Sequence, residues 1–436
     1  MNDEVIFIYT NTFEMEINKN IMLSRLKVVY ILLFIWINSS TIKSQEYKHT
    51  SINMETGKNL KQVINAFDTK SIIGLGEGTH GTKEFNDVRI ALIKELVNKG
   101  YKTIIFENAF GDTYFLNQEL NSEVPLSTVM QNNLLSIWQT DEVKNFLTWI
   151  RLYNQKHSDK ITLYGADFNY VSNAIKILQQ QLGSNNEDIN KDLLRLKEIG
   201  NIQDSIWNKQ NDKNFKIDMN TLIENGNEGY ELTQKIDAFT KQNTMKSSKS
   251  SLELALANCT YAFSTFYAAK KKTEEKSRDE LMANMISKIQ EEKKKVIIWA
   301  HSAHISFQFP YNVTDLAMGG YLKQHYGDKY YALGTLTAKG TYSATLDRID
   351  TKNNSFKSYT LNPIVEKSWE YYFSQNKDTM FFIDLHQNSN LKKLLKMKFI
   401  GYGPEREDSY TKDINISDFF DGIIFIKNTS AAVHTL

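Results

Sequence analysis

Cysteine and proline are scarce in this sequence, and positive and negative charges are almost balanced. Cys259 is the only cysteine in 436 residues, so neither an internal disulfide nor a cysteine-based zinc site can form. The 4 prolines and 20 glycines argue against a linker-rich or disordered chain. A net charge of +1 gives no overall attraction to nucleic acid or to an anionic surface. What is present is a chain that is 41% hydrophobic and long enough to bury a substantial core.

A hydrophobic run near the N-terminus is too short to span a bilayer. It covers the ten residues 28–37, follows Arg25 and Lys27, and precedes the polar residues 38–41. A basic, then an apolar, then a polar segment predict a signal peptide, which we place in residues 1–44. We therefore expect an exported, periplasmic protein that has no membrane span after cleavage. An uncleaved anchor is the alternative, and without a functional signal the protein would be cytoplasmic.

Short apolar runs and amphipathic segments alternate through residues 45–436. An apolar run at 71–75 is followed by a helical pattern at 84–99 and by a second apolar run at 101–106. This order predicts a βαβ unit with parallel strands. Further strands are expected at 161–164, 296–299, 330–335, 379–385 and 422–426. We predict an α/β domain with a mostly parallel β-sheet flanked by helices. A helical insertion at about 174–290 is expected to form one wall of the active-site cleft.

Four glycines surround two reactive side chains in the first predicted strand-to-helix turn. Glu77 and His80 lie within this turn. The glycines are Gly74, Gly76, Gly78 and Gly81. Their density indicates either an unusual backbone conformation or a backbone that something approaches closely. It also disfavours a helix through Glu77 and His80.

Polar residues follow several of the predicted strands. The carboxyl ends of parallel strands meet at one edge of a sheet, so we expect these side chains to gather there. They are Glu77, His80, Glu107, Asp167, His301 and His304. Arg89 lies two to three helical turns after His80, where it can either orient a carboxylate or form a surface ion pair.

Three chemistries can use this set of residues. A histidine beside a carboxylate can act as a general base that activates water for attack on an ester carbonyl. Glu77-x-x-His80 together with His301-x-x-His304 can instead bind a metal ion that activates the water. A serine nucleophile is the third option, but Ser302 lacks a Gly-x-Ser-x-Gly frame and the sequence contains none elsewhere.

The turn and the segments that follow it resemble the erythromycin esterase family. The segment 76–85, GEGTHGTKEF, is similar to the G-E-x-x-H-x-x-x-E-F signature of that family. Arg89 matches its downstream arginine, and Glu107 matches the glutamate that ends its second strand. Trp138 and the helical segment 146–154 are similar to its tryptophan-containing helix.

Two later blocks extend this resemblance to the second half of the chain. Arg278-Asp279, followed by Met282-Ala283, resembles the Arg-Asp and Met-Ala pairs of the family. The segment 299–304, WAHSAH, is similar to its W-A-H-N-x-H block, with Ser302 where many relatives carry asparagine. The resemblance covers nearly all of the chain after the predicted signal peptide, up to residues 420–425.

The resemblance implies a hydrolase that opens the macrolactone ester of an erythromycin-like macrolide, which would give macrolide resistance. It implies that His80 is the general base and that Glu77 and Glu107 orient it or the water. It places His301, His304 and Arg89 on the carbonyl side. Substrate-binding roles are expected for Asp167, Arg278, Trp138 and Ser302. No obligatory metal or cofactor is implied.

Two other functions stay open at this point. A metal-dependent hydrolase of another small-molecule ester would use the same histidines as ligands. A non-enzymatic protein would use them to hold a small molecule or a haem. In each case the expected partner is a small molecule and not a nucleic acid.

Overall fold

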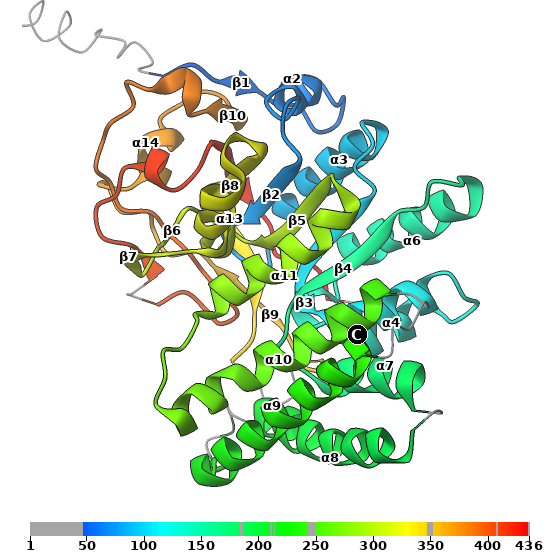
Figure 1. Cartoon of the computed structure of the whole chain (residues 1–436). Coiled ribbons are helices and arrows are strands. Elements are labelled where there is room, and N and C mark those ends of the chain that lie inside the picture. The colour runs from blue at the N-terminus through cyan, green and yellow to red at the C-terminus, as the bar shows by residue number, and fades with distance from the viewer. Residues whose placement is uncertain are drawn as a thin grey trace, which may run out of the picture. The chain divides into compact units, whose positions relative to one another are not determined.

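A nine-stranded β-sheet, parallel in its central part, organises the chain (Figure 1). The strands follow the order β1-β10-β11-β8-β2-β5-β3-β4, and β9 pairs with β8. Neighbours from β11 to β4 run parallel, whereas β1, β9 and β10 are antiparallel to their partners. The strands are β1 (Thr50–Ser51), β2 (Ile72–Glu77), β3 (Thr103–Ala109), β4 (Thr162–Asp167), β5 (Val296–His301), β8 (Tyr330–Ala344), β9 (Lys357–Thr360), β10 (Met380–Asp384) and β11 (Gly422–Thr429). A separate hairpin is formed by β6 (Gln308–Phe309) and β7 (Asn312–Leu316).

The computed structural model describes residues 47–183, 186–209, 212, 214–242, 249–346, 352–406 and 409–434. Lys48–Leu436 forms one compact unit. The predicted signal peptide at 1–44 lies outside the described residues, so export stays a prediction. Of the helices in the described part, none has the length and apolar character needed to cross a membrane.

The α/β class and the mostly parallel sheet are confirmed, and a strand forms at each predicted apolar run. Several strands extend beyond their predicted apolar run. Backbone hydrogen bonds hold the strands together, so a strand can include buried polar side chains that have hydrogen-bond partners. β2 ends at Glu77 and β5 ends at His301, and these two residues are paired in the ladder. Glu107 lies within β3, and Asp167 ends β4. Four candidate residues therefore belong to the strands themselves.

Helices cover both faces of the sheet (Figure 1). Side chains alternate along β2, so Ile73 and Leu75 join the core beneath α3 while Gly74 and Gly76 face α12. Outside the β4–β5 connection the helices are α2 (Leu60–Asn65), α3 (Lys83–Asn98), α4 (Phe110–Leu120), α5 (Leu126–Asn133), α6 (Asp141–Lys156), α12 (Ser302–Ile305), α13 (Met318–Tyr326) and α14 (Trp369–Ser374).

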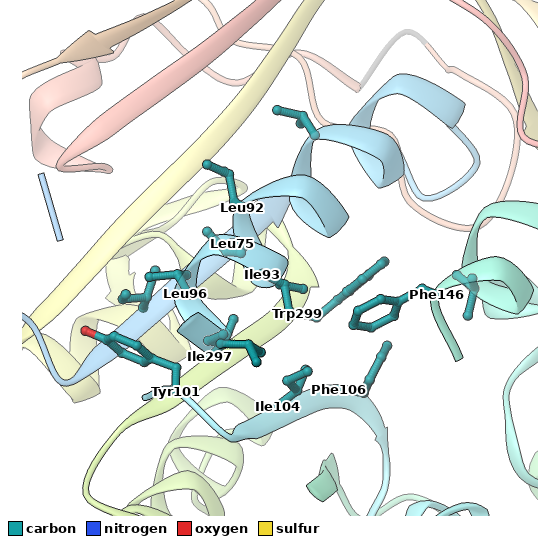
Figure 2. Packing of buried hydrophobic residues seen from close by; sticks show 14 of the residues in the cluster. Leu75, Leu92, Ile93, Leu96, Tyr101, Ile104, Phe106, Phe146, Ile297 and Trp299 are labelled. Atoms are coloured by element: carbon teal, nitrogen blue, oxygen red, sulfur yellow. The ribbon is translucent and has the colours of Figure 1, made fainter. Parts of the chain in front are cut away.

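Aliphatic side chains and several large aromatic ones fill the core between α3, α6 and the central strands (Figure 2). The ring of Trp299 in β5 stacks on Phe106 of β3, with 5.2 Å between centroids, and lies 5.6 Å from the ring of Phe146 in α6. The Arg89 guanidinium also lies over the Trp299 ring, 4.2 Å from its centre. The core thereby holds a cation of α3 close to the ends of β2 and β5.

Close packing requires the four glycines of the predicted turn, two of which, Gly74 and Gly76, belong to β2 itself. None of the four adopts a positive φ. A Cβ on Gly76 would lie 2.6 Å from Ser302 Oγ, and one on Gly81 would lie 1.9 Å from the Ser343 carbonyl oxygen. The sequence left open whether these glycines serve an unusual backbone conformation or the close approach of another group. Close approach is the reason, and the approaching groups are other residues of this chain.

Between β4 and β5, where the sequence predicts a helical insertion, the described residues form five helices and no strand. They are α7 (Ser172–Leu182), α8 (Glu187–Lys209), α9 (Met219–Gln242), α10 (Lys249–Lys271) and α11 (Arg278–Lys293). α8, α9 and α10 pack in sequence against one another, and α11 returns the chain to the sheet beside β4 (Figure 1). Arg278, the first residue of α11, is thereby placed near the carboxyl end of β4.

We expect Gly81→Ala to destabilise the protein by about 3 kcal/mol or more, because the new methyl group overlaps the Ser343 backbone. The Gly81 carbonyl also accepts hydrogen bonds from the N–H groups of Ser343 and Ala432, so any displacement breaks these contacts. Gly403→Ala is a matched control, because its nearest contact would be 3.8 Å away. Thermal unfolding checks the prediction, and equal midpoints for the two variants would contradict it.

Candidate active site

Glu77 joins a histidine and an arginine through the two oxygens of one carboxylate. Oε1 accepts a hydrogen bond from His80 Nδ1 at 2.8 Å, and Oε2 accepts one from Arg89 Nη2. Glu77 is fully buried and Arg89 is 1% exposed. Burial lowers the pKa of Arg89, and the negative charge of Glu77 opposes this shift. Arg89 therefore orients a carboxylate and does not form a surface ion pair.

The contact with Glu77 determines which nitrogen of neutral His80 carries the proton. Nδ1–H donates to Glu77, so the free lone pair lies on Nε2. Within the described part of the chain, Nε2 has no hydrogen-bond partner. The imidazole ring packs edge-on against Trp138, with 5.4 Å between centroids, and lies 4.8 Å from His301. An imidazole held in this way is arranged to act as a general base.

Glu107 connects the other polar residues of the strand ends. Its Oε2 accepts the backbone N–H of His301 at 2.9 Å. Its Oε1 lies 3.3 Å from His304 Nε2 and 3.4 Å from Arg278 Nη2. Burial favours the neutral carboxyl, but His304, His80 and Arg278 outweigh burial and hold the pKa of Glu107 well below its usual value. Glu107 is therefore an anion that contacts the His301 backbone, His304 and Arg278.

His304 lies between two carboxylates. Its Nδ1 is 2.8 Å from Asp279 Oδ1, and its Nε2 faces Glu107. Burial by itself would lower the pKa of His304, but Glu107 and Asp279 together raise it above its usual value. Asp279 in turn accepts the backbone N–H of Met318. The sequence resemblance included Asp279 beside Arg278 but assigned it no role, and only the structure reveals its contact with His304.

Arg278 forms the outer part of the same network. Its Nη2 donates to Asp167 Oδ2 at 2.6 Å, and its Nη1 lies 3.2 Å from His304 Nε2. The predicted Asp167 is thus a partner of Arg278, and it also accepts the backbone N–H of Phe168. Arg278 and His304 together place positive charge beside the ends of β3 and β4.

His301 has both ring nitrogens bound to backbone. Nε2–H donates to the carbonyl of Ile400 at 3.1 Å, and Nδ1 accepts the N–H of Ala303 at 3.3 Å. Burial, assisted by His80, lowers the pKa of His301 to about 3. The side chain is therefore neutral near pH 7 and has no free nitrogen for a substrate.

Trp138 and Ser302, both predicted to contact substrate, are fully buried. Trp138 donates its Nε1–H to the carbonyl of Glu107 at 3.3 Å, and its ring packs perpendicular to that of His80. Ser302 begins α12 and lies against Gly76 of β2. In this structure neither side chain is accessible to a bound molecule, so their predicted substrate-binding roles gain no support from the geometry.

A metal site built from the candidate residues does not fit the geometry. Both oxygens of Glu77 and both nitrogens of His301 are already engaged within the protein. Among the described residues, no three or more His, Cys, Asp or Glu side chains are placed together to hold an ion. A chelate through Glu77, His80, His301 and His304 would have to break these contacts first.

A cavity of about 530 Å³ opens beside Arg278, between the helical insertion and the segment that follows β4. Its volume is typical of small-molecule sites. Its walls are mostly apolar and include Phe168, Trp207, Ile217, Met219, Phe266 and Leu281. Arg278 belongs both to this wall and to the Glu107 network, whereas Glu77, His80, Glu107, His301 and His304 do not line the cavity.

Comparison with known proteins identifies the group to which this fold and site belong. A family model described as erythromycin esterase matches residues 96–429, well over half of the chain. The chain belongs to the erythromycin esterase family.

Relatives within and around this family are distant. A putative hydrolase of Bacillus subtilis, YbfO, is 24% identical over 87% of this chain and 88% of its own length. Erythromycin esterase type II of Escherichia coli is 25% identical over 73% of this chain and 80% of its own length. These family and relative names support a hydrolase.

Two solved structures share the fold. A Bacillus cereus protein has a TM-score of 0.74 and 20% identity, with 90% of this chain and 98% of that one covered. A mutant of the erythromycin esterase EreC in its open conformation has a TM-score of 0.66 and 17% identity, with 87% and 97% covered. The family match includes Glu107, Arg278 and the histidines of β5 and α12 but begins after His80. The family match therefore does not cover Glu77, His80 and Arg89, and their assignment to the site rests on the contacts between them.

We expect Asp279→Asn to move the alkaline limb of the pH profile of kcat/KM to lower pH by about 1 unit. Asp279 helps to raise the pKa of His304, so the protonated imidazole is maintained to a higher pH in the wild type and is lost earlier in the variant. Asparagine keeps an oxygen that can accept the hydrogen bonds of His304 and Met318. An unchanged alkaline limb would show that His304 does not act as a cation.

We also expect the free energy of unfolding to fall on acidification more steeply in the wild type than in His301→Gln. The pKa of His301 is about 3 in the folded protein and near 6.5 in the unfolded chain. The unfolded chain therefore binds a proton that the folded protein does not, and stability is lost as the pH falls from 6.5 towards 3. Denaturant unfolding between pH 6.5 and 5 should give a difference in slope of at most about 1.4 kcal/mol per pH unit. Equal slopes would contradict a neutral His301.

Proposed function

We propose that this protein is a carboxylic-ester hydrolase that opens the lactone of an erythromycin-like macrolide with a water activated by His80. The observation that carries the proposal is the orientation of His80, whose Nδ1–H is held by Glu77 while Nε2 has no hydrogen-bond partner among the residues that the structure describes. The family, the E. coli relative and an apolar cavity of about 530 Å³ beside the site support a large ester as substrate.

In this mechanism His80 Nε2 takes a proton from a water molecule as the water attacks the ester carbonyl. The imidazolium that forms is stabilised by Glu77, whose negative charge is maintained by Arg89. Arg89 is buried and bound to Glu77, so it acts through this carboxylate and not on the carbonyl side.

His304 and Arg278 supply the positive charge for the oxygen of the tetrahedral intermediate. Both lie beside Glu107, and the raised pKa of His304 favours its protonated form. His301 is neutral near pH 7, because burial lowers its pKa to about 3, so it supplies no positive charge. We therefore assign His301 to the support of the site, and the carbonyl side to the positive charge of His304 and Arg278.

Incubation with erythromycin should give a product heavier by one water, detected by mass spectrometry. We expect His80→Asn to reduce kcat by about 10³-fold, because the general base is lost. His157→Asn is a control on an exposed histidine, and it should keep full activity. Circular dichroism should show that both variants are folded. Near-normal turnover by His80→Asn would exclude His80 as the base, and intact erythromycin with wild-type protein would exclude this substrate.

A further inference from the structure

The chain that follows β11, residues 430–434, lies against the turn between β2 and α3. The N–H of Ala432 donates to the Gly81 carbonyl at 2.9 Å, and the N–H of Lys83 donates to the Ser430 carbonyl at 3.0 Å. The family match ends with β11, so these contacts are made by residues outside it. They hold the backbone of the turn that carries the general base of the proposed mechanism.

The same segment also binds the loop that leads into α6. The N–H of Asp141, the first residue of α6, donates to the Val433 carbonyl at 2.9 Å. This loop carries Trp138, whose ring packs perpendicular to that of His80 with 5.4 Å between centroids. Residues 430–434 therefore contact both the turn that contains the base and the loop whose tryptophan packs against it.

His434 makes the side-chain contacts between these two parts of the chain. Its Nδ1 lies 3.1 Å from the Ser136 carbonyl oxygen, and its Nε2 lies 2.9 Å from Ser343 Oγ. A carbonyl oxygen only accepts, so Nδ1 carries the proton and the lone pair of Nε2 accepts the Ser343 hydroxyl. Burial lowers the pKa of His434 to about 4, so the ring is neutral near pH 7 and keeps this arrangement.

Each partner of this imidazole belongs to a segment next to His80. The N–H of Ser343 donates at 2.8 Å to the carbonyl of Gly81, the residue that directly follows the base, and its hydroxyl lies 3.3 Å from the same carbonyl. Ser136 begins the short helix η1 (Ser136–Trp138), which ends at the tryptophan beside the base. The imidazole thus connects the two segments whose relative position sets the place of the catalytic ring.

We propose that His434 is a positioning residue for His80, which fixes the turn that follows the base relative to Trp138. It does not touch the reacting atoms, because both of its nitrogens are bound within the protein and its ring stacks on Phe356 with 3.8 Å between centroids. A displacement of a catalytic group by about 1 Å can lower a rate by about 10²-fold, so such support affects catalysis. This inference rests on the proposed function, since it concerns the base of that reaction.

The test compares His434→Phe and His434→Gln with wild type, using erythromycin as the probe. Phenylalanine keeps a ring that can stack on Phe356 but has no polar atom, whereas the amide of glutamine offers one donor and one acceptor in place of the two nitrogens. We expect His434→Phe to lower kcat by about 10- to 30-fold and to change KM less than about twofold. His434→Gln should restore kcat to within about threefold of wild type.

Two control variants separate positioning from a general loss of stability. Val433→Ala changes an exposed side chain next to His434 and keeps the backbone carbonyl that Asp141 needs, so kcat should not change. Ile383→Val removes a buried methyl group from β10, which two strands separate from β2, and it should lower the thermal midpoint without lowering kcat. Wild-type kcat in His434→Phe, or a higher KM with kcat unchanged, would overturn the proposal.

Proton exchange at His80 gives a readout that needs no substrate. Its Nδ1–H is bound to the buried Glu77 carboxylate and is therefore protected from water. NMR of protein labelled with ¹⁵N-histidine detects this proton, and its signal is identified by its absence from His80→Asn. We expect its exchange to be at least about 10-fold faster in His434→Phe and unchanged in Val433→Ala.

The kinetic and NMR readouts distinguish failure of this inference from failure of the proposed function. Faster exchange in His434→Phe, without hydrolysis of erythromycin by the wild type, would leave the positioning of His80 standing and exclude the substrate. Hydrolysis by the wild type with kcat and exchange both unaffected in His434→Phe would overturn the positioning role and leave the proposed function standing. A loss of kcat with unchanged exchange would show that His434 does not act through His80, which also overturns the inference. Absence of hydrolysis together with unchanged exchange would overturn both.

Discussion

The double use of the Glu77 carboxylate is the interaction on which the site depends. One oxygen fixes the proton position of His80, and the other binds a guanidinium that is itself held over the Trp299 ring. Glu77 and Arg89 are both buried, so each charge has its partner inside the protein and away from water. The Trp299 ring and the aromatic core around it hold Arg89 in this position.

Segments distant in sequence complete the site through backbone contacts. The Ile400 N–H donates to the carbonyl of Gly78, and the Ile400 carbonyl accepts the Nε2–H of His301. The β2–α3 turn is thereby connected to the C-terminal segment around Ile400, in which the ring of Tyr402 lies 6.5 Å from that of His80. The neighbouring histidines have different protonation states. Burial keeps His301 neutral, whereas Glu107 and Asp279 favour the charged form of His304.

The sequence by itself determined the parallel sheet and the gathering of Glu77, His80, Glu107, Asp167, His301 and His304 at one edge of it. Apolar runs, helical periodicity and the rule that parallel strands end together are local signals, and they are enough for this result. Only the tertiary structure decided what each side chain does. The burial of Arg89, the occupied nitrogens of His301 and the contact between Asp279 and His304 depend on neighbours brought together by folding, and protonation follows from those neighbours. The same applies to the turn glycines, whose need for close packing comes from Ser302 and Ser343 more than 200 residues away.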